Sequence, residues 1–77
     1  MDHPPSLLFI GGHDPSGGAG LQADIETAAA LGCRSYSLVT CLTHQDTHNV
    51  YGIFPQTATN FAQQFDTLLS DITLDIV

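Results

Sequence analysis

The sequence predicts an α/β fold with a mostly parallel sheet, and three observations point to it. Residues 6–10 (SLLFI) form a short apolar run of the kind found in buried strands. Residues 18–31 carry apolar side chains at helical spacing, and residues 36–42 (YSLVTCL) form a second apolar, partly β-branched run. Strands separated by a helix are joined by right-handed crossovers and lie parallel, with helices on the faces of the sheet.

The first strand and helix have recognisable boundaries. Prolines precede the strand at 4–5, and glycines follow it at 11–12. Ser16 is a candidate N-cap for the helix, and Gly32 stands where a C′ glycine is expected. The helix presents its apolar side chains at Leu21, Ile25, Ala28 and Leu31.

The second half of the chain repeats the pattern. A polar loop at 43–49 follows the second strand, and residues 50–54 are expected to be extended before Pro55. The helical period is clearest over 58–72, with Thr57 as the predicted N-cap. Residues 74–77 (LDIV) resemble the start of a third parallel strand with nothing after it. We therefore expect residues 1–77 to be a single, incomplete α/β unit.

Charge and composition exclude several classes of function. The net charge is −7, and Arg34 is the only Lys or Arg, so binding of nucleic acid through phosphate contacts is not expected. No apolar run approaches the ~20 residues that span a bilayer, and no secretory signal is recognisable. A cytoplasmic location follows, with Cys33 and Cys41 as free thiols.

The glycine-rich stretch FIGGHDPSGGAG at 9–20 does not match a nucleotide loop well. Gly12 and Gly17 have Walker A spacing, but Gly18 and Ala19 stand where a Lys and a hydroxyl are needed. Residues 18–23 match G-x-G-x-x-A, yet the stretch HDPS at 13–16 intervenes after the strand, and the expected acid is displaced to Asp46.

Two readings of the glycines remain open. Gly11 and Gly12 would let the backbone approach a flat, mostly neutral ligand, or the glycines simply permit a turn around Asp14-Pro15. Both this loop and the loop at 43–49 leave the carboxyl ends of predicted strands, where ligands bind in such sheets.

Asp24 and Gln45 are candidate ligand-binding residues. Helical spacing places Asp24 toward a half-buried surface, where a carboxylate needs a hydrogen-bond partner. The Gln45 amide offers a donor and an acceptor, which together with Asp24 would complement a heterocycle bearing an exocyclic amine. The alternatives are a surface acid near a helix N-terminus and a solvated loop amide.

A longer pattern resembles one family. The block DPSGGAGLQAD, the ALG that closes the helix, and TCLTHQDT at the end of the next strand are similar to the hydroxymethylpyrimidine/phosphomethylpyrimidine kinases of thiamine biosynthesis. These belong to the ribokinase-like superfamily, so the resemblance implies the N-terminal portion of a three-layer α/β fold. It extends over about residues 7–77 and covers roughly the first third of such an enzyme.

The resemblance implies phosphorylation of a pyrimidine by ATP and Mg²⁺ in a parent enzyme, which is a cytoplasmic homodimer. It maps substrate binding onto Gly12, Asp24 and Gln45. The anion hole, the general base and the ATP site belong to parts of the family's sequence that have no counterpart here. We therefore expect no catalytic or metal-binding residue in this chain and no kinase activity from it alone. His13 and Asp46 depart from the commoner pattern, and no role is assigned to either.

Two alternatives stay open. The chain could be a non-catalytic remnant that binds a small molecule or a partner protein, or part of a ribokinase-like kinase for another vitamin precursor such as pyridoxal.

Overall fold

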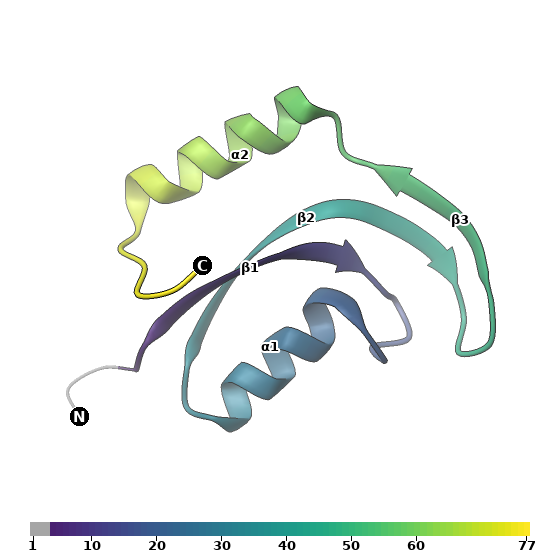
Figure 1. Cartoon of the computed structure of the whole chain (residues 1–77), viewed down its shortest axis with the longest axis horizontal. Helices are drawn as coiled ribbons and strands as arrows, with labels where there is room; N and C mark the ends of the chain where they lie inside the picture. Colours follow the sequence, from purple (N-terminus) through teal and green to yellow (C-terminus); the bar gives the residue numbers. More distant parts are fainter. Residues whose placement is uncertain (1–3) are drawn as a thin grey trace.

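The computed structural model describes residues 4–77 and contains one three-stranded sheet with a helix on each side (Figure 1). The elements in chain order are β1 (Ser6–His13), α1 (Gly20–Ala30), β2 (Arg34–Gln45), β3 (Val50–Pro55) and α2 (Ala58–Asp71). In Figure 1, α1 lies below the sheet and α2 lies above it. The predicted α/β class and the three layers are confirmed.

The sheet has the order β1-β2-β3 and is mixed. β1 and β2 are parallel, as predicted for strands on either side of a crossover helix, whereas β2 and β3 form an antiparallel hairpin. β2 is longer than its apolar run: it extends into the sequence predicted as a polar loop and ends at Gln45. The cross-strand hydrogen bonds of the hairpin extend the strand through polar residues that the sequence pattern assigned to a loop.

A register shift in the β1–β2 pair lies near the carboxyl end of β1. Gly11 pairs with Val39 and Gly12 with Cys41, so Thr40 is the extra residue of a bulge. The carbonyl of Thr40 accepts a hydrogen bond from the N–H of Gln56, 2.8 Å away, where β3 leads into α2. The bulge therefore connects the β1–β2 pair with the start of the upper layer.

The termini of α1 differ in how well the sequence predicted them. Gly32 has φ +77, its N–H bonds to Ala29 O, and the N–H of Cys33 bonds to Ala28 O, which is the Schellman arrangement expected of a C′ glycine. The N-cap prediction is wrong. The helix begins at Gly20 with Ala19 as its N-cap, and alanine has no polar side chain to make a capping bond. Ser16 lies three residues earlier, and its hydroxyl bonds to Asp14.

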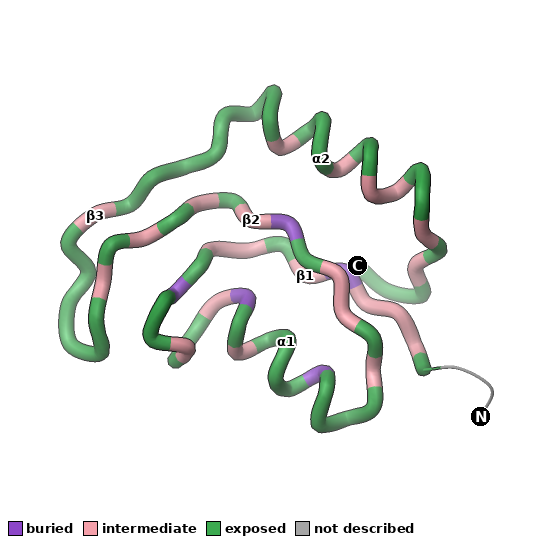
Figure 2. Tube along the Cα trace, turned by 180° about the vertical axis from the view of Figure 1, so that it is seen from behind, coloured by how far each residue is buried: buried purple, intermediate pink, exposed green. Residues whose placement is uncertain are grey.

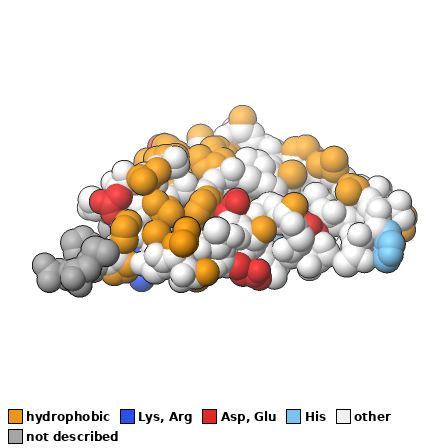
Figure 3. All heavy atoms as spheres, turned by 60° about the horizontal axis from the view of Figure 1, so that its bottom comes forward, with side chains coloured by type: hydrophobic (Ala, Val, Ile, Leu, Met, Phe, Trp, Pro, Cys, Tyr) orange, Lys and Arg blue, Asp and Glu red, His pale blue; other side chains and the backbone are white. Residues whose placement is uncertain are grey.

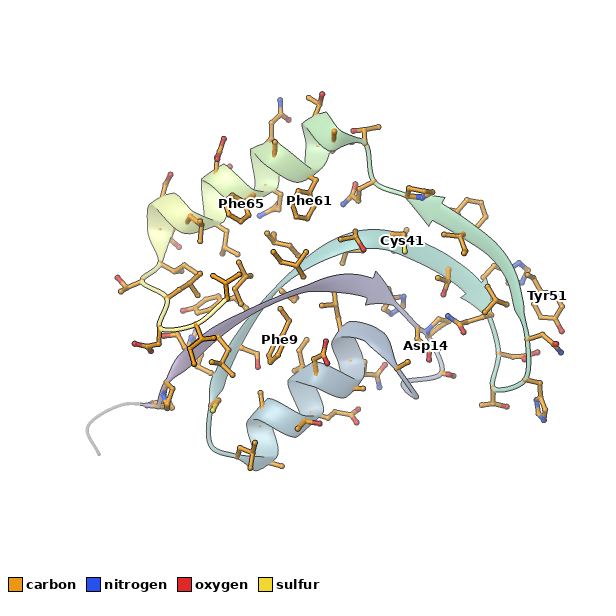
Figure 4. All side chains as sticks on the ribbon, in the orientation of Figure 1. Phe9, Asp14, Cys41, Tyr51, Phe61 and Phe65 are labelled. Atoms are coloured by element: carbon orange, nitrogen blue, oxygen red, sulfur yellow. The ribbon has the colours of Figure 1, made fainter. Side chains whose placement is uncertain are left out.

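The N-cap of α2 is the one predicted. Thr57 Oγ1 accepts a hydrogen bond from the N–H of Asn60 at 3.1 Å. Phe61 and Phe65 project from α2 toward the sheet, with ring centroids 6.3 Å apart (Figure 4). No residue of α2 is buried, so its apolar stripe is only partly covered.

The core is small and divided between the two faces of the sheet. Its buried apolar residues are Leu8, Leu21, Ala28 and Leu38. Leu21 and Ala28 are buried on α1, whereas Leu8 and Leu38 lie on the opposite face, because β1 turns Leu7, Phe9 and Gly11 toward α1. Figure 2 shows how few positions are buried and that the hairpin and α2 are mostly exposed. The Cα atoms extend over 43 × 31 × 12 Å, so the structure is a curved slab with little interior.

Of the predicted third strand, the described residues form only a single bridge to β1. Residues 75–77 come back beside β1, where Leu7 and Ile76 form a parallel bridge and Leu8 N–H bonds to Ile76 O at 2.8 Å. Ser6 N–H also bonds to Asp75 Oδ2 at 2.7 Å. The direction is the predicted one, but within residues 4–77 the bridge does not extend into a ladder. No helix of this described part is long and apolar enough to cross a membrane.

Candidate functional site

The carboxyl ends of β1 and β2 are joined by a chain of side-chain hydrogen bonds. Thr43 Oγ1 donates to the carbonyl of His13, the last residue of β1, at 2.7 Å. Gln45, the last residue of β2, donates from Nε2 to Thr43 Oγ1 at 2.6 Å. The predicted site residue Gln45 is therefore held at the end of the sheet where ligands bind in α/β folds.

This chain of bonds determines which way the Gln45 amide is turned. A carbonyl can only accept, so the single hydroxyl proton of Thr43 is committed to His13 O. Thr43 Oγ1 must then accept from Gln45, which places the NH₂ group toward Thr43. The Gln45 Oε1 atom, half-buried with the rest of the side chain, remains as an acceptor for a donor such as an exocyclic amine.

Gly12 and Gly11 are both packed closely, but against different neighbours. A Cβ on Gly11 would lie 3.6 Å from Leu21 Cδ2, so this position faces α1. Successive residues of a strand face opposite sides, and a Cβ on Gly12 would lie 3.1 Å from Cys41 Sγ. The missing side chain of Gly12 therefore makes room for Cys41.

The start of α1 lies against the end of β1. Gly20 has φ +68, and a Cβ there would stand 2.5 Å from the Gly12 carbonyl oxygen. His13 and Gly20 form an isolated antiparallel bridge at the same place. Only glycine permits both the backbone conformation and this approach, so Gly20 sets how closely α1 begins behind Gly12.

Asp14 organises the loop between β1 and α1. It is only 8% exposed and is the one buried polar residue among residues 4–77. Its carboxylate accepts from Ser16 Oγ at 2.6 Å, Ser16 N–H at 2.9 Å and Ala19 N–H at 3.1 Å. These bonds, that of the Ser16 hydroxyl above all, hold the pKa of Asp14 below its ordinary value against the opposing effect of burial.

Asp24 lies apart from the other two predicted site residues. It is exposed, which corrects the expectation of a half-buried carboxylate, and no hydrogen bond holds it within residues 4–77. It lines a hollow of about 280 Å³ between α1 and β1, together with Leu7, Phe9, Thr27, Ala28, Leu31 and Cys33. Phe9 projects into the space between β1 and α1 in Figure 4. Gly12 and Gln45 lie at the same end of the sheet. Asp24 lies apart from them on α1, one helical turn after Gly20.

The β2–β3 turn is ordered by a second aspartate. Asp46 Oδ1 accepts from the N–H groups of His48 and Asn49 at 2.8 and 2.9 Å, and Tyr51 Oη donates to Oδ2 at 3.4 Å. The His48 bond is the main cause that lowers the pKa of Asp46. Tyr51 lies on the outer side of the hairpin in Figure 4. Asp46 thus stabilises the turn that follows Gln45.

The described residues do not fit a polyphosphate or a clustered metal site. Arg34 is the only Lys or Arg of the sequence and begins β2, so it lies at the opposite end of this strand from Gln45. Its Nε donates to Tyr36 Oη at 2.8 Å, and its guanidinium lies over the Tyr36 ring. On the face shown in Figure 3, carboxylates are scattered among apolar side chains and blue is confined to one end. Residues 4–77 contain no group of three His, Cys, Asp or Glu placed to hold a metal ion.

Sequence reasoning missed Asp14 and Thr43. The sequence offers Asp14 only as part of a possible turn with Pro15, although an Asp-Pro-Ser before a glycine pair is a signal for a side chain that bonds to the following amides. Thr43 carried no signal, because its role depends on the His13 carbonyl, thirty residues earlier in the chain.

Comparisons with known proteins identify the family. The family model of phosphomethylpyrimidine kinase matches residues 14–77. The chain belongs to the phosphomethylpyrimidine kinase family. It is 43% identical to the hydroxymethylpyrimidine/phosphomethylpyrimidine kinase of Escherichia coli over 70 residues, which are 91% of this chain and 26% of that protein. It is 42% identical over 73 residues to a thiamine biosynthesis multifunctional protein of Corynebacterium efficiens, covering 95% of this chain and 10% of that protein.

Solved structures of kinases share the fold. The phosphomethylpyrimidine kinase of Clostridium difficile superposes with a TM-score of 0.83 at 32% identity over 95% of this chain and 32% of that one. A pyridoxal kinase from Staphylococcus aureus, solved with pyridoxal, gives a TM-score of 0.81 at 32% identity over 95% of this chain and 28% of that one. The predicted ribokinase-like α/β fold is confirmed. The chain spans about a quarter of the Escherichia coli kinase it matches.

Proposed function

We propose that this chain is the pyrimidine-binding portion of a hydroxymethylpyrimidine/phosphomethylpyrimidine kinase. The observation that carries the proposal is the orientation of Gln45 in a chain that the family model matches over residues 14–77. Gln45 Oε1 is left as an acceptor at the end of β2, and an aminopyrimidine has an exocyclic amine to donate to it.

Each predicted site residue has its own role in this proposal. Gln45 binds the amine edge of the ring, and the ring lies beside the backbone of Gly12 at the end of β1. Asp24 stands on α1 with a free, exposed carboxylate, so it can reach a ring nitrogen or amine only from the α1 side. A ligand that contacts all three must lie around the end of the sheet, next to the loop at 14–19.

Phosphoryl transfer requires groups that we assign to the rest of a complete kinase. When bound there, ATP with Mg²⁺ supplies the phosphoryl group and neutralises its charge. Residues of this chain hold and orient the acceptor, which is the part of catalysis that depends on positioning. A reducing, cytoplasmic location, which the free thiols of Cys33 and Cys41 suit, and a homodimeric parent enzyme are parts of the same proposal.

Binding to the chain tests the substrate site directly. Titration of the ¹⁵N-labelled chain with hydroxymethylpyrimidine should shift the side-chain amide signals of Gln45. The exposed Gln63 on α2 is the matched control, and its signals should not move. A titration that leaves Gln45 unshifted in the folded chain contradicts the proposal. Any turnover of hydroxymethylpyrimidine with Mg-ATP by the chain alone contradicts the assignment of the catalytic groups elsewhere.

A pyridoxal kinase is the second candidate, because the Staphylococcus aureus enzyme superposes nearly as well. Pyridoxal carries a ring hydroxyl and an aldehyde and has no exocyclic amine. We therefore expect hydroxymethylpyrimidine to shift the Gln45 amide at lower concentration than pyridoxal does. The reverse order would favour the pyridoxal kinase.

A further inference from the structure

The loop at 14–19 has the amide groups of a phosphate-binding loop but already contains an anion. Phosphate loops use successive backbone N–H groups, freed by glycines, just before a helix. Here the N–H groups of Ser16 and Ala19 point at the Asp14 carboxylate, 2.9 and 3.1 Å away. The N–H of Gly18 also acts on this carboxylate and lowers its pKa.

The turn geometry brings the carboxylate to these amides. Gly17 N–H bonds to Asp14 O at 3.0 Å, with Pro15 and Ser16 between them, as in a type I turn with proline at its second position. Gly17 then adopts φ +77, which reverses the chain so that Gly18 and Ala19 face back toward Asp14. Figure 4 places Asp14 in this connection, at the end of the sheet.

We propose that Asp14 is a specificity-determining residue: its carboxylate occupies the loop as an internal anion and excludes phosphate from the amides of residues 16–19. The tethered carboxylate is always present at high effective concentration, so a free anion has to displace it. Its negative charge also repels any phosphate oxygen that approaches these amides. An uncharged part of a ligand can therefore lie against the loop, whereas a phosphate group is excluded from it.

The inference goes beyond the proposed function, because it concerns what the loop excludes and does not depend on which ring the chain binds. It also explains a feature of the sequence. A stretch with five glycines and Walker A spacing lacks the lysine of a phosphate loop, and in the structure its amides bond to a carboxylate of the loop itself.

Removing the carboxylate tests the proposal. Inorganic phosphate is titrated into the ¹⁵N-labelled full chain, either unchanged or carrying Asp14→Ala. In the unchanged chain, the amide signals of Ser16, Gly18 and Ala19 should not shift saturably. In the Asp14→Ala chain these three signals should shift and saturate, and phosphate should raise the midpoint of thermal unfolding. Ser16→Ala is the matched control: it removes the hydroxyl donor, keeps the carboxylate, and should leave the loop insensitive to phosphate.

Asp14→Asn covers the case in which the alanine variant does not fold. It keeps the shape of the side chain and one acceptor while removing the charge, so its loop should also gain a saturable response to phosphate. Saturable shifts at these amides in the unchanged chain would overturn the proposal. The proposal would also be overturned if both Asp14 variants fold and their loop amides do not respond to phosphate. Failure of both variants to fold even with phosphate present would overturn it as well.

Discussion

Gln45 Nε2 lies 2.6 Å from Thr43 Oγ1, and this pair sets the direction of the amide at the end of β2. Thr43 in turn donates to the His13 carbonyl at 2.7 Å, so the end of β1 orients a side chain on β2. In the proposed site, Thr43 is therefore a positioning residue, which contacts Gln45 and acts on a ligand only through it.

Replacing Thr43 with valine should weaken pyrimidine binding without unfolding the protein. Valine keeps the β-branched shape but leaves the Gln45 amide free to turn, which removes a hydrogen bond worth about 0.5–1.5 kcal/mol. The measurement is the Kd of hydroxymethylpyrimidine in a complete kinase that carries this chain as its N-terminal segment. Thr43→Ser should restore most of the affinity. An unchanged Kd for Thr43→Val would show that the amide is oriented by other contacts.

Replacing Gln45 itself with alanine should cost more, about 1–3 kcal/mol of binding free energy, because a buried polar edge of the ligand loses its partner. The same complete kinase and titration apply. Gln63→Ala, at an exposed position of α2, is the control that should leave the Kd unchanged. Equal effects of the two substitutions would count against Gln45 as a binding residue.

Gly20→Ala should destabilise the chain severely. The left-handed conformation at φ +68 costs a non-glycine residue about 1–2 kcal/mol, and the added Cβ would also stand 2.5 Å from the Gly12 carbonyl. Gly32→Ala is the matched control: its φ is +77, but no atom lies within 4 Å of the Cβ position. Urea unfolding should show a clearly larger loss for Gly20→Ala. Equal losses would mean that the contact with Gly12 can relax.

Stability should fall in acid partly through Asp14. The pKa of this carboxyl is lowered in the folded chain from an ordinary value of 3.8, chiefly by the hydrogen bond from the Ser16 hydroxyl. A lowered pKa means that the stabilisation is complete well above pH 3.8 and is lost as the pH falls through the folded value. Asp46 acts in the same direction. Urea unfolding between pH 3 and 7 should show a shallower acid loss for Asp14→Asn, and a slope equal to that of the unchanged chain would refute the assignment.

Thr57→Ala should destabilise α2 by about 1 kcal/mol, because the N–H of Asn60 loses its cap. Thr59→Ala, within the first turn of the same helix, serves as the control and should be neutral or slightly stabilising, since alanine is the better helix former. Denaturant unfolding of the two variants gives the comparison. A loss at Thr59 as large as that at Thr57 would argue against the cap.

By itself the sequence determined the local features. The helical spacing and the cap at Thr57 placed α2, Gly32 marked the end of α1, and the strand–helix–strand order set the parallel pairing of β1 and β2. These follow from side-chain periodicity and from bonds between residues a few positions apart, which a sequence displays directly.

Only the tertiary structure decided the features that depend on distant backbone. The extension of β2 to Gln45 needs its pairing with β3, and the orientation of Gln45 needs the His13 carbonyl across the sheet. The exposure of Asp24 depends on how α1 lies over β1. In each case the outcome depends on the path of the chain in space, which the spacing of residues does not record.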